Sequence, residues 1–215
     1  MIKAVLFDLD GTLINSLDDL SDSVNHTLEC FGIAKHKTEK FKYFVGDGMR
    51  KLIERALPEN RRDDDTIGAV LEKFMAYYKE HSLCKTAPYN DIDALLEALE
   101  KRGIITVVIT NKADSAAGHI TRHFFGDKIS RVYGQREGVP TKPDPTLVNL
   151  ALAELQFSPE ECLFVGDSGM DMLVAVNSGT IPVGVTWGFR TKEELLKNGA
   201  KYLINAPLEL LDLVK

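Results

Sequence analysis

Residues 3–13 read KAVLFDLDGTL: an apolar run, two aspartates one residue apart, and a glycine. The run Ala4–Phe7 predicts a strand that is buried on both faces, as in a parallel sheet. Side chains alternate along an extended segment, so Asp8 and Asp10 point the same way, and two like charges there need a cation nearby. Gly11 permits a sharp turn or a close approach to a ligand. The segment therefore favours a site for a hard cation and a phosphate, although Asp-x-Asp-Gly alone is more often a plain turn.

The composition sets the class of protein. A chain of 215 residues with 44% hydrophobic content can form one domain with an insertion, or two small domains. The net charge of −6 argues against a nucleic-acid surface, and no apolar run approaches the length of a transmembrane helix. The widely spaced Cys30, Cys84 and Cys162 fit no metal site and are interpreted as reduced thiols. We expect a cytoplasmic monomer or homodimer that acts on a small molecule, with no nucleic-acid or membrane partner.

A helical pattern follows the first segment. Apolar residues recur at helical spacing from Leu17 to Phe31, and Gly32 is expected to end this helix. Ser16 and Asp19 have the spacing of a capping box, with Asp in the place of Glu. Before residue 82 we expect no strand and three more helices, around residues 41–45, 49–57 and 67–78.

The pattern changes after Pro88, where strands begin to alternate with helices. Strands are expected at residues 104–109, 131–133, 162–165, 181–185 and 202–204, with helices at 92–103, 113–125, 145–156, up to Gly179, and in the tail at 192–198 and 207–214. This alternation indicates a doubly wound, parallel, Rossmann-like α/β sheet. The predicted organisation is an α/β core of residues 1–15 and 83–215, with an all-helical domain of residues 16–82 inserted after the first strand.

Polar residues follow three of the apolar strands. They are Asp8 and Asp10 after the first strand, Thr110 and Asn111 after residues 104–109, and Asp167, Ser168 and Asp171 after residues 162–165. A fourth polar element, which contains Lys142, lies just before a helix. Ligands of open parallel sheets bind beyond the carboxyl ends of the strands, so these residues should meet at one edge.

The acids among them predict a metal site. Asp8, Asp10 and Asp167 offer the oxygen ligands that Mg²⁺ prefers, and the absence of His or Cys beside them argues against zinc. Asp167 also fits a plain acid at a helix N-terminus. Ser168 and Asp171 have capping-box spacing, so Asp171 either supports the metal site from behind, or caps the helix, or does both.

The remaining groups predict phosphate chemistry. Lys142 can neutralise a carboxylate and a transferring phosphoryl group, while Thr110 and Asn111 can donate hydrogen bonds to a phosphate oxygen. Taken singly, each of these three fits an ordinary turn or strand-end residue better than a phosphate ligand. Together they suit attack by a carboxylate on phosphorus to give an aspartyl-phosphate. The second carboxyl would protonate the leaving alcohol and then activate water, and Mg²⁺ would bridge nucleophile and phosphate.

With these residues in order along the chain, the sequence resembles the haloacid dehalogenase-like superfamily, within its phosphoglycolate phosphatase-like hydrolases. The resemblance rests on DLDGTL at residues 8–13, Thr110, Lys142-Pro143, and Gly166-Asp167-Ser168 with Asp171. It implies that Asp8 is the nucleophile and Asp10 the acid/base. It implies that Mg²⁺ is held by the Asp8 carboxylate, the Asp10 main-chain carbonyl and Asp167, that Thr110 and Lys142 bind phosphate, and that residues 16–82 form a mobile helical cap.

The resemblance also narrows the activity. Because position 10 is an aspartate, the sequence looks like that of a phosphatase or a mutase of this superfamily. Residues 45–50, VGDGMR, are similar to the cap loop of phosphoglycolate phosphatases. Arg50 in that loop either meets a substrate carboxylate or faces solvent. We expect a Mg²⁺-dependent phosphatase for 2-phosphoglycolate. The alternatives are a sugar-phosphate mutase similar to β-phosphoglucomutase, an inorganic pyrophosphatase, and a non-catalytic binding protein on the same fold.

Overall fold

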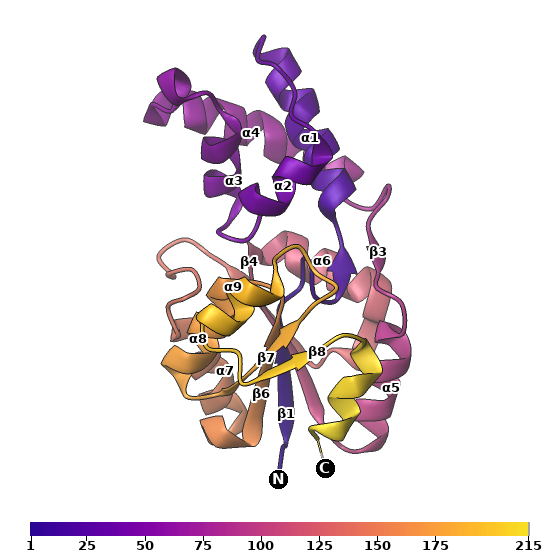
Figure 1. Cartoon of the computed structure of the whole chain (residues 1–215). Coiled ribbons are helices and arrows are strands. Elements are labelled where there is room, and N and C mark those ends of the chain that lie inside the picture. Colours follow the sequence, from indigo (N-terminus) through magenta and orange to yellow (C-terminus); the bar gives the residue numbers. More distant parts are fainter. Residues whose placement is uncertain (215) are drawn as a thin grey trace.

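A six-stranded parallel sheet forms the centre of the computed structural model, which describes residues 1–214 (Figure 1). The strand order is β5-β4-β1-β6-β7-β8, and every neighbouring pair is parallel. The bounds are β1 Ala4–Phe7, β4 Ile105–Ala113, β5 Arg131–Gln135, β6 Cys162–Gly166, β7 Ile181–Val185 and β8 Tyr202–Ile204. The predicted doubly wound α/β class is therefore confirmed, and β1 lies between the two strands that precede the other predicted site residues.

Helices cover both faces of this sheet. Val5 and Phe7 of β1 pack on one side with helices α5 and α6, whereas Ala4 and Leu6 pack on the other side with α7 and α8. This alternation explains why β1 has no polar position. The bounds are α5 Ile92–Lys101, α6 Asp114–Phe125, α7 Thr146–Leu155, α8 Gly169–Ser178 and α9 Lys192–Lys197, with short 3₁₀ turns at Gly126–Lys128, Pro159–Glu161 and Pro207–Asp212.

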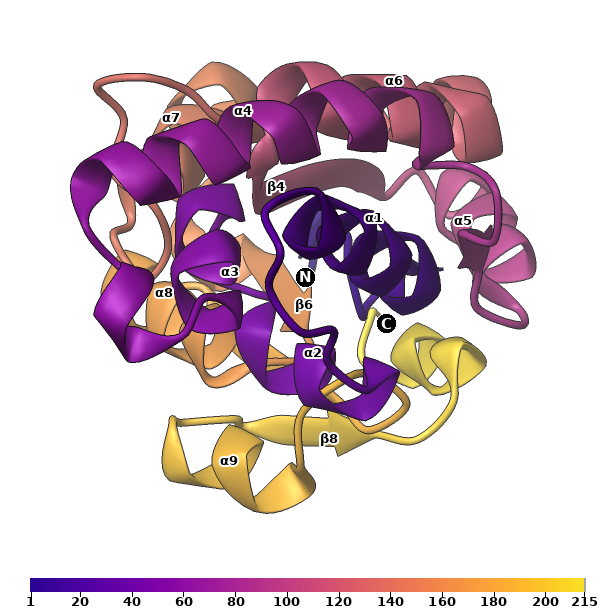
Figure 2. The same ribbon diagram turned by 90° about the horizontal axis from the view of Figure 1, so that it is seen from above.

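The helical insertion stands above the carboxyl ends of the strands, as Figures 1 and 2 show from two directions. It consists of α1 Leu17–Cys30, α2 Thr38–Phe44, α3 Met49–Ala56 and α4 Asp64–His81, with a 3₁₀ turn at Glu59–Arg61. Its apolar residues form a core of their own, with Leu20, Phe41, Leu52 and Phe74 fully enclosed. The expected insertion after β1 is thus confirmed, while the domain limits at residues 15/16 and 82/83 stay a prediction. We call this insertion the cap.

Two short strands connect the cap to the sheet domain, and the sequence analysis expected neither. Strand β2, Ile14–Asn15, pairs antiparallel with β3, Ala87–Pro88. Next to them the buried carboxylate of Asp19 accepts hydrogen bonds from the backbone of Lys85 and from the backbone and hydroxyl of Thr86, at 2.7–2.9 Å. The two crossings between the domains are therefore fastened to each other.

The capping box expected at Ser16 and Asp19 was wrong. The Ser16 hydroxyl makes no bond to the start of α1 and instead donates to Asp10 at 2.5 Å. Asp19 is occupied by the second crossing, as described above. Both side chains have partners outside the helix, because the helix begins where the two crossings meet.

Most other elements agree with the sequence to within a few residues. The main difference is β4, which continues past Ile109 to Ala113 with a break in its regular pairing. This extension carries Thr110 and the two residues after it over the edge of the sheet. The last helix, expected at residues 207–214, is a 3₁₀ helix at Pro207–Asp212. Within residues 1–214, none of the helices is both long and apolar enough to cross a membrane.

We expect Asp19→Asn to lower the free energy of unfolding by about 2–4 kcal/mol, because the new amide group would face the backbone donors of Lys85 and Thr86. Urea denaturation measures the difference. The control is Asp18→Asn, on the exposed side of the same helical turn, which should leave stability nearly unchanged. Equal effects of the two substitutions would contradict the role given to Asp19.

Candidate active site

A buried lysine joins two carboxylates above the central strands. The ammonium of Lys142 donates to Asp8 Oδ1 at 2.7 Å and to Asp171 Oδ1 at 2.6 Å, and it approaches the carbonyl of Ile109 at 3.3 Å. Lys142 comes from the loop before α7, Asp8 from the end of β1 and Asp171 from the first turn of α8. The structure thus brings together segments that the sequence predicted to share one sheet edge.

Three carboxylates form the acidic part of this site. Oxygen atoms of Asp8, Asp167 and Asp171 all lie within 4.8 Å of one another, and all three residues are buried. Against three carboxylates stands one ammonium, that of Lys142, which leaves an excess of two negative charges. An all-oxygen donor set with this excess fits a divalent hard cation such as Mg²⁺.

Asp167 is held in a tight space at the end of β6. Its Oδ2 accepts a hydrogen bond from the backbone N–H of Phe189 at 2.7 Å, and Thr12 donates to its Oδ1 at 3.4 Å. A Cβ on Gly11 would lie 2.4 Å from Oδ2, and one on Gly188 would lie 2.2 Å from the Cβ of Asp167. Two glycines are therefore needed for the loops to close around this carboxylate, and Gly11 also has a positive φ of 90°.

Asp171 caps α8, as the sequence allowed, whereas its support of a metal site stays a prediction. The backbone N–H of Ser168 donates to Oδ2 of Asp171 at 3.0 Å, and the backbone N–H of Asp171 donates to the hydroxyl oxygen of Ser168 at 3.4 Å; these two bonds form the expected capping box of α8. The Ser168 hydroxyl also donates to Oδ2 at 2.6 Å. Its other oxygen accepts the bond from Lys142. The capping box of α8 therefore fixes the carboxylate of Asp171, which in turn accepts the bond from Lys142.

Burial and neighbouring charges raise the pKa of two acids in this cluster, Asp8 and Asp167. Burial raises the pKa of Asp8 from its ordinary 3.8 to about 6; the ammonium of Lys142 opposes this shift and Asp171 adds to it. Burial, followed by the charges of Asp171 and Asp8, raises the pKa of Asp167 well above its ordinary value. Carboxylates in this condition are ionised at neutral pH only at a cost in free energy, and a bound cation would remove that cost.

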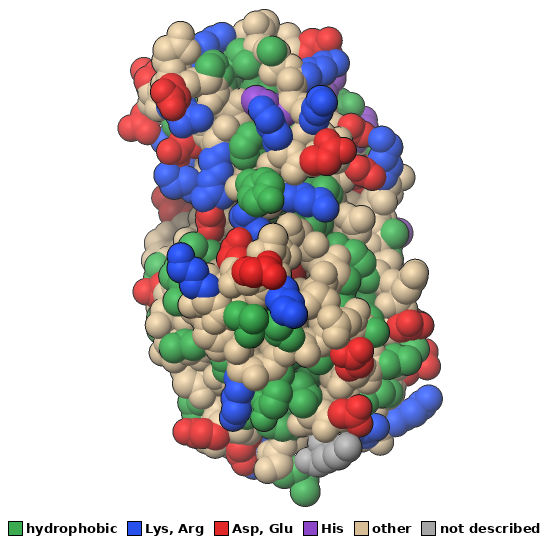
Figure 3. Space-filling view, in the orientation of Figure 1, with side chains coloured by type: hydrophobic (Ala, Val, Ile, Leu, Met, Phe, Trp, Pro, Cys, Tyr) green, Lys and Arg blue, Asp and Glu red, His purple; other side chains and the backbone are tan. Residues whose placement is uncertain are grey.

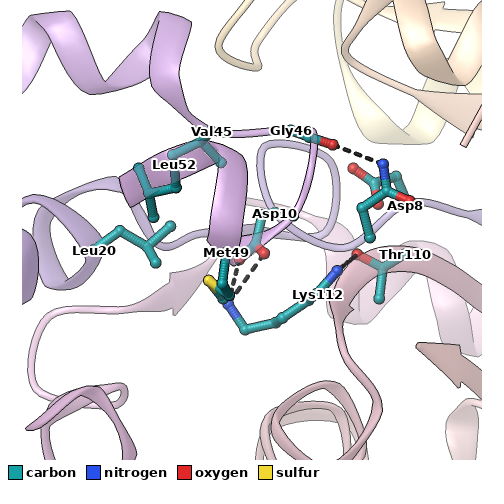
Figure 4. Close-up of a pocket in the computed structure, with 11 residues that line it drawn as sticks. Asp8, Asp10, Leu20, Val45, Gly46, Met49, Leu52, Thr110 and Lys112 are labelled. Carbon is teal, nitrogen blue, oxygen red and sulfur yellow. Dashed lines mark hydrogen bonds and ion pairs between the residues drawn. The ribbon is translucent and has the colours of Figure 1, made fainter. Parts of the chain in front are cut away.

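Asp10 lies apart from the cluster. Its carboxylate forms an ion pair with Lys112, whose ammonium lies 3.1 and 3.0 Å from the two oxygens, and it accepts the bond from Ser16. Figure 4 shows the Lys112 side chain reaching toward Asp10 beside Met49. Lys112 was not among the site residues predicted from the sequence. The sequence did contain a signal: Lys112 lies two residues after Thr110, so their side chains point the same way in an extended segment, as do those of Asp8 and Asp10.

A cavity of about 30 Å³ lies between the cap and these core residues. By the usual measure this is room for about two water molecules. The core side is polar and the cap side is mainly apolar. The lining residues are Asp8, Asp10, Thr110, Asn111 and Lys112 from the core, and Leu20, Val45, Gly46, Gly48, Met49 and Leu52 from the cap. A phosphate ester much larger than this space would require the cap to move.

Of the other predicted site residues, Thr110 and Asn111 lie at the cavity, whereas Arg50 does not. Thr110 is buried at the cavity and accepts a bond from the backbone of Lys112. The Asn111 amide donates to the carbonyl of Gly46 in the cap at 2.9 Å, and its oxygen accepts from the backbone of Lys142. Arg50, in contrast, is half exposed on α3, forms an ion pair with Asp64 and does not line the cavity.

Known proteins resemble this chain in sequence and in fold. A family model for haloacid dehalogenase-like hydrolases matches residues 5–185. The phosphoglycolate phosphatase of Neisseria gonorrhoeae is 35% identical over 87% of this chain and 81% of its own length, and that of Haemophilus influenzae is 30% identical over 99% and 98%. Among solved structures, a haloacid dehalogenase-like family hydrolase of Streptococcus pneumoniae superposes with a TM-score of 0.90 at 26% identity, over 100% of this chain and 99% of that one.

We expect Asp167→Asn to raise the melting temperature of the metal-free protein near neutral pH, because it removes a buried charge. A carboxyl with a raised folded pKa destabilises the fold above that pKa and ceases to do so below the unfolded value, so the difference from wild type should shrink on acidification. One kcal/mol corresponds to about 2–4 °C in a chain of this size. Millimolar Mg²⁺ should raise the melting temperature of wild type but not of the variant.

The control for this prediction is Glu137→Gln, which removes one exposed carboxylate that is not part of the cluster. It should change neither the metal-free melting temperature nor the response to Mg²⁺. A destabilised Asp167→Asn protein that still responds to Mg²⁺ would contradict the assignment of Asp167.

Proposed function

This chain belongs to the haloacid dehalogenase-like hydrolases, and from that premise we propose that it is a Mg²⁺-dependent phosphatase for a small phosphate monoester, 2-phosphoglycolate. The observation that carries the proposal is the buried group of Asp8, Asp167 and Asp171 around Lys142 at the carboxyl ends of the strands. The relatives named above as phosphoglycolate phosphatases support the choice of substrate.

In the proposed first step, Asp8 attacks phosphorus. Lys142 bonds to Oδ1 of Asp8, which leaves Oδ2 as the attacking atom and places a positive charge beside the phosphoryl oxygens. The P–O bond to the alcohol breaks, and the alcohol oxygen takes a proton from Asp10. Mg²⁺, held by Asp8, Asp167 and the Asp10 main-chain carbonyl, would supply charge neutralisation.

In the second step, the water oxygen bonds to phosphorus while Asp10 accepts a water proton; the bond from phosphorus to Asp8 breaks, which returns the Asp8 carboxylate and releases phosphate. Thr110 lines the cavity, where its hydroxyl would donate to phosphate. Asn111 would contribute by holding Lys142 and the cap loop, through the bonds already described. The apolar cap residues would keep bulk water from the intermediate.

The cavity is smaller than a phosphate monoester, so the cap would have to open to admit the substrate, and surface charge supports an anionic one. Lys and Arg side chains gather on the lower part of the cap, next to the core, on the face shown in Figure 3. Such a patch can attract phosphate esters to a protein whose net charge is −6. A role for Arg50 at the substrate carboxylate stays a prediction, since Arg50 would first have to leave Asp64.

We further propose a cytoplasmic location, which agrees with the three cysteines being free thiols. The working form is expected to be a monomer or a homodimer, and gel filtration of the pure protein distinguishes the two.

We expect Asp8→Asn to reduce kcat more than about 1,000-fold, because the amide cannot attack phosphorus. Circular dichroism should show an unchanged fold, since Asn keeps an acceptor for Lys142. Turnover near the wild-type rate in this variant would exclude Asp8 as the nucleophile.

A phosphate-release screen over phosphorylated metabolites tests the substrate and the metal together. The highest kcat/KM should be for 2-phosphoglycolate, EDTA should abolish turnover, and added Mg²⁺ should restore it. Metal-independent turnover would contradict the ligand assignment. Conversion of a hexose 1-phosphate to the 6-phosphate without phosphate release would instead indicate the mutase.

A further inference from the structure

The loop between β7 and α9 contacts both the acidic cluster and the cap within three consecutive residues, Gly188, Phe189 and Arg190. We call these three residues the bridging segment. Figure 1 shows this loop rising from the sheet toward the cap. None of their side chains takes part in the chemistry proposed above, so their contacts need an explanation of their own.

On the core side, the bridging segment encloses Asp167. The backbone N–H of Phe189 donates to Oδ2 of Asp167 at 2.7 Å. Gly188 lies so close that a Cβ there would be 2.2 Å from the Cβ of Asp167 and 2.5 Å from the carbonyl oxygen of Gly11. Closely packed groups of this kind transmit displacement instead of absorbing it. The segment therefore cannot move without changing the surroundings of the Asp167 carboxylate.

On the cap side, the same segment is held by two side chains. The ring of Phe189 packs against the apolar core of the cap. The guanidinium of Arg190 donates to the carbonyl of Val45 at 3.0 Å and lies 5.4 Å from the centre of the Tyr43 ring. The Arg190 side chain is only 13% exposed, so these contacts are not those of a freely solvated arginine. Phe189 thus has its backbone on Asp167 and its ring in the cap.

The part of the cap that Arg190 holds is the roof of the cavity. Val45 and Gly46 both line the cavity, and each accepts one hydrogen bond from the core: Val45 from Arg190 and Gly46 from Asn111. The cavity is too small for a phosphate ester, so the cap must open before a substrate enters. Opening the roof would separate the carbonyl of Val45 from Arg190.

We propose that the bridging segment couples the position of the cap to that of Asp167, with Phe189 and Arg190 as its positioning residues. The inference rests on the proposed function, which assigns Asp167 to the Mg²⁺ site. With the cap open, the Phe189 ring loses its packing and Arg190 loses its acceptor, so the N–H that holds Asp167 is no longer fixed from above.

Such a coupling acts in both directions. If the closed cap orders Asp167 and thereby tightens the binding of Mg²⁺, then Mg²⁺ must favour the closed cap by the same factor. The metal would therefore help to close the site over a substrate. This reciprocity allows the coupling to be measured without any turnover.

The test is hydrogen exchange of the cap loop, residues 45–48, in the pure protein with and without Mg²⁺ and with no substrate present. In the wild type, Mg²⁺ should slow the exchange of these amides by about 5-fold or more, the lower end of typical coupling between sites. In Phe189→Ala and in Arg190→Met, Mg²⁺ should still slow exchange around Asp167 but should no longer slow it in the cap loop.

The affinity for Mg²⁺ gives a second measurement on the same proteins. Calorimetric titration should show the Kd for Mg²⁺ rising in both variants by about the factor that the cap loop loses, again about 5-fold or more. A purely structural role for the two side chains would lower the melting temperature and leave this Kd unchanged.

Matched controls remove the same kinds of group within the sheet domain. Phe157 packs against the core cluster beside α7 and α8, and Arg102 donates to the carbonyl of Leu211 at 2.6 Å. Phe157→Ala and Arg102→Met should leave both the Kd for Mg²⁺ and the response of the cap loop unchanged. If Phe189→Ala does not fold by circular dichroism, Arg190→Met, which keeps the apolar packing, decides the question.

Two results would overturn the inference. One is protection of the cap loop by Mg²⁺ to the same extent in the wild type and in both variants. The other is a wild-type protein that binds Mg²⁺ with no change in the exchange of the cap loop. Absence of Mg²⁺ binding by the wild type would instead contradict the proposed function, and the inference would fall with it.

Discussion

The site depends on two hydrogen bonds that the Lys142 ammonium donates, one to Asp8 and one to Asp171. Three carboxylates come together because parallel strands deliver their carboxyl ends to one edge, and burial makes their mutual repulsion strong. A single ammonium relieves part of it, and two glycines allow the loops to close around Asp167. The fold therefore maintains a group of buried carboxylates that could hold a divalent cation.

The cap contributes to the site through contacts with consecutive residues of β4. Asn111 holds the cap loop at Gly46, and Lys112 meets Tyr78 of α4. On the other side, Asp19 fastens the start of the cap to the returning crossing at Thr86. Cap position is thus linked both to the cavity and to the carboxylate of Asp10, so the proposed chemistry and the access of substrate depend on the same contacts.

The sequence was sufficient for the residues whose position follows from topology. Once the strands are parallel, Asp8, Thr110 and Asp167 must lie at one edge, and the alternation of strands and helices in the sequence indicates that topology. It was insufficient where partners are set by three-dimensional contacts. Ser16 and Asp19 fit a capping box, but their partners lie in the β1 loop and in the second crossing, 66–67 residues away for Asp19. Lys112 looks like a solvated strand end unless the cap above it is known.

Asp8 and Asp10 have the same side chain, lie two residues apart and would repel each other in isolation. The structure separates them by giving each its own cation: Lys142 from the loop before α7 for Asp8, and Lys112 from β4 for Asp10. Asp8 then shares its surroundings with two more acids, whereas Asp10 faces the cap and the first crossing. Two carboxylates with different surroundings can act as nucleophile and as acid/base in one reaction. The difference between them therefore comes from their lysine partners, which the motif containing both aspartates does not include.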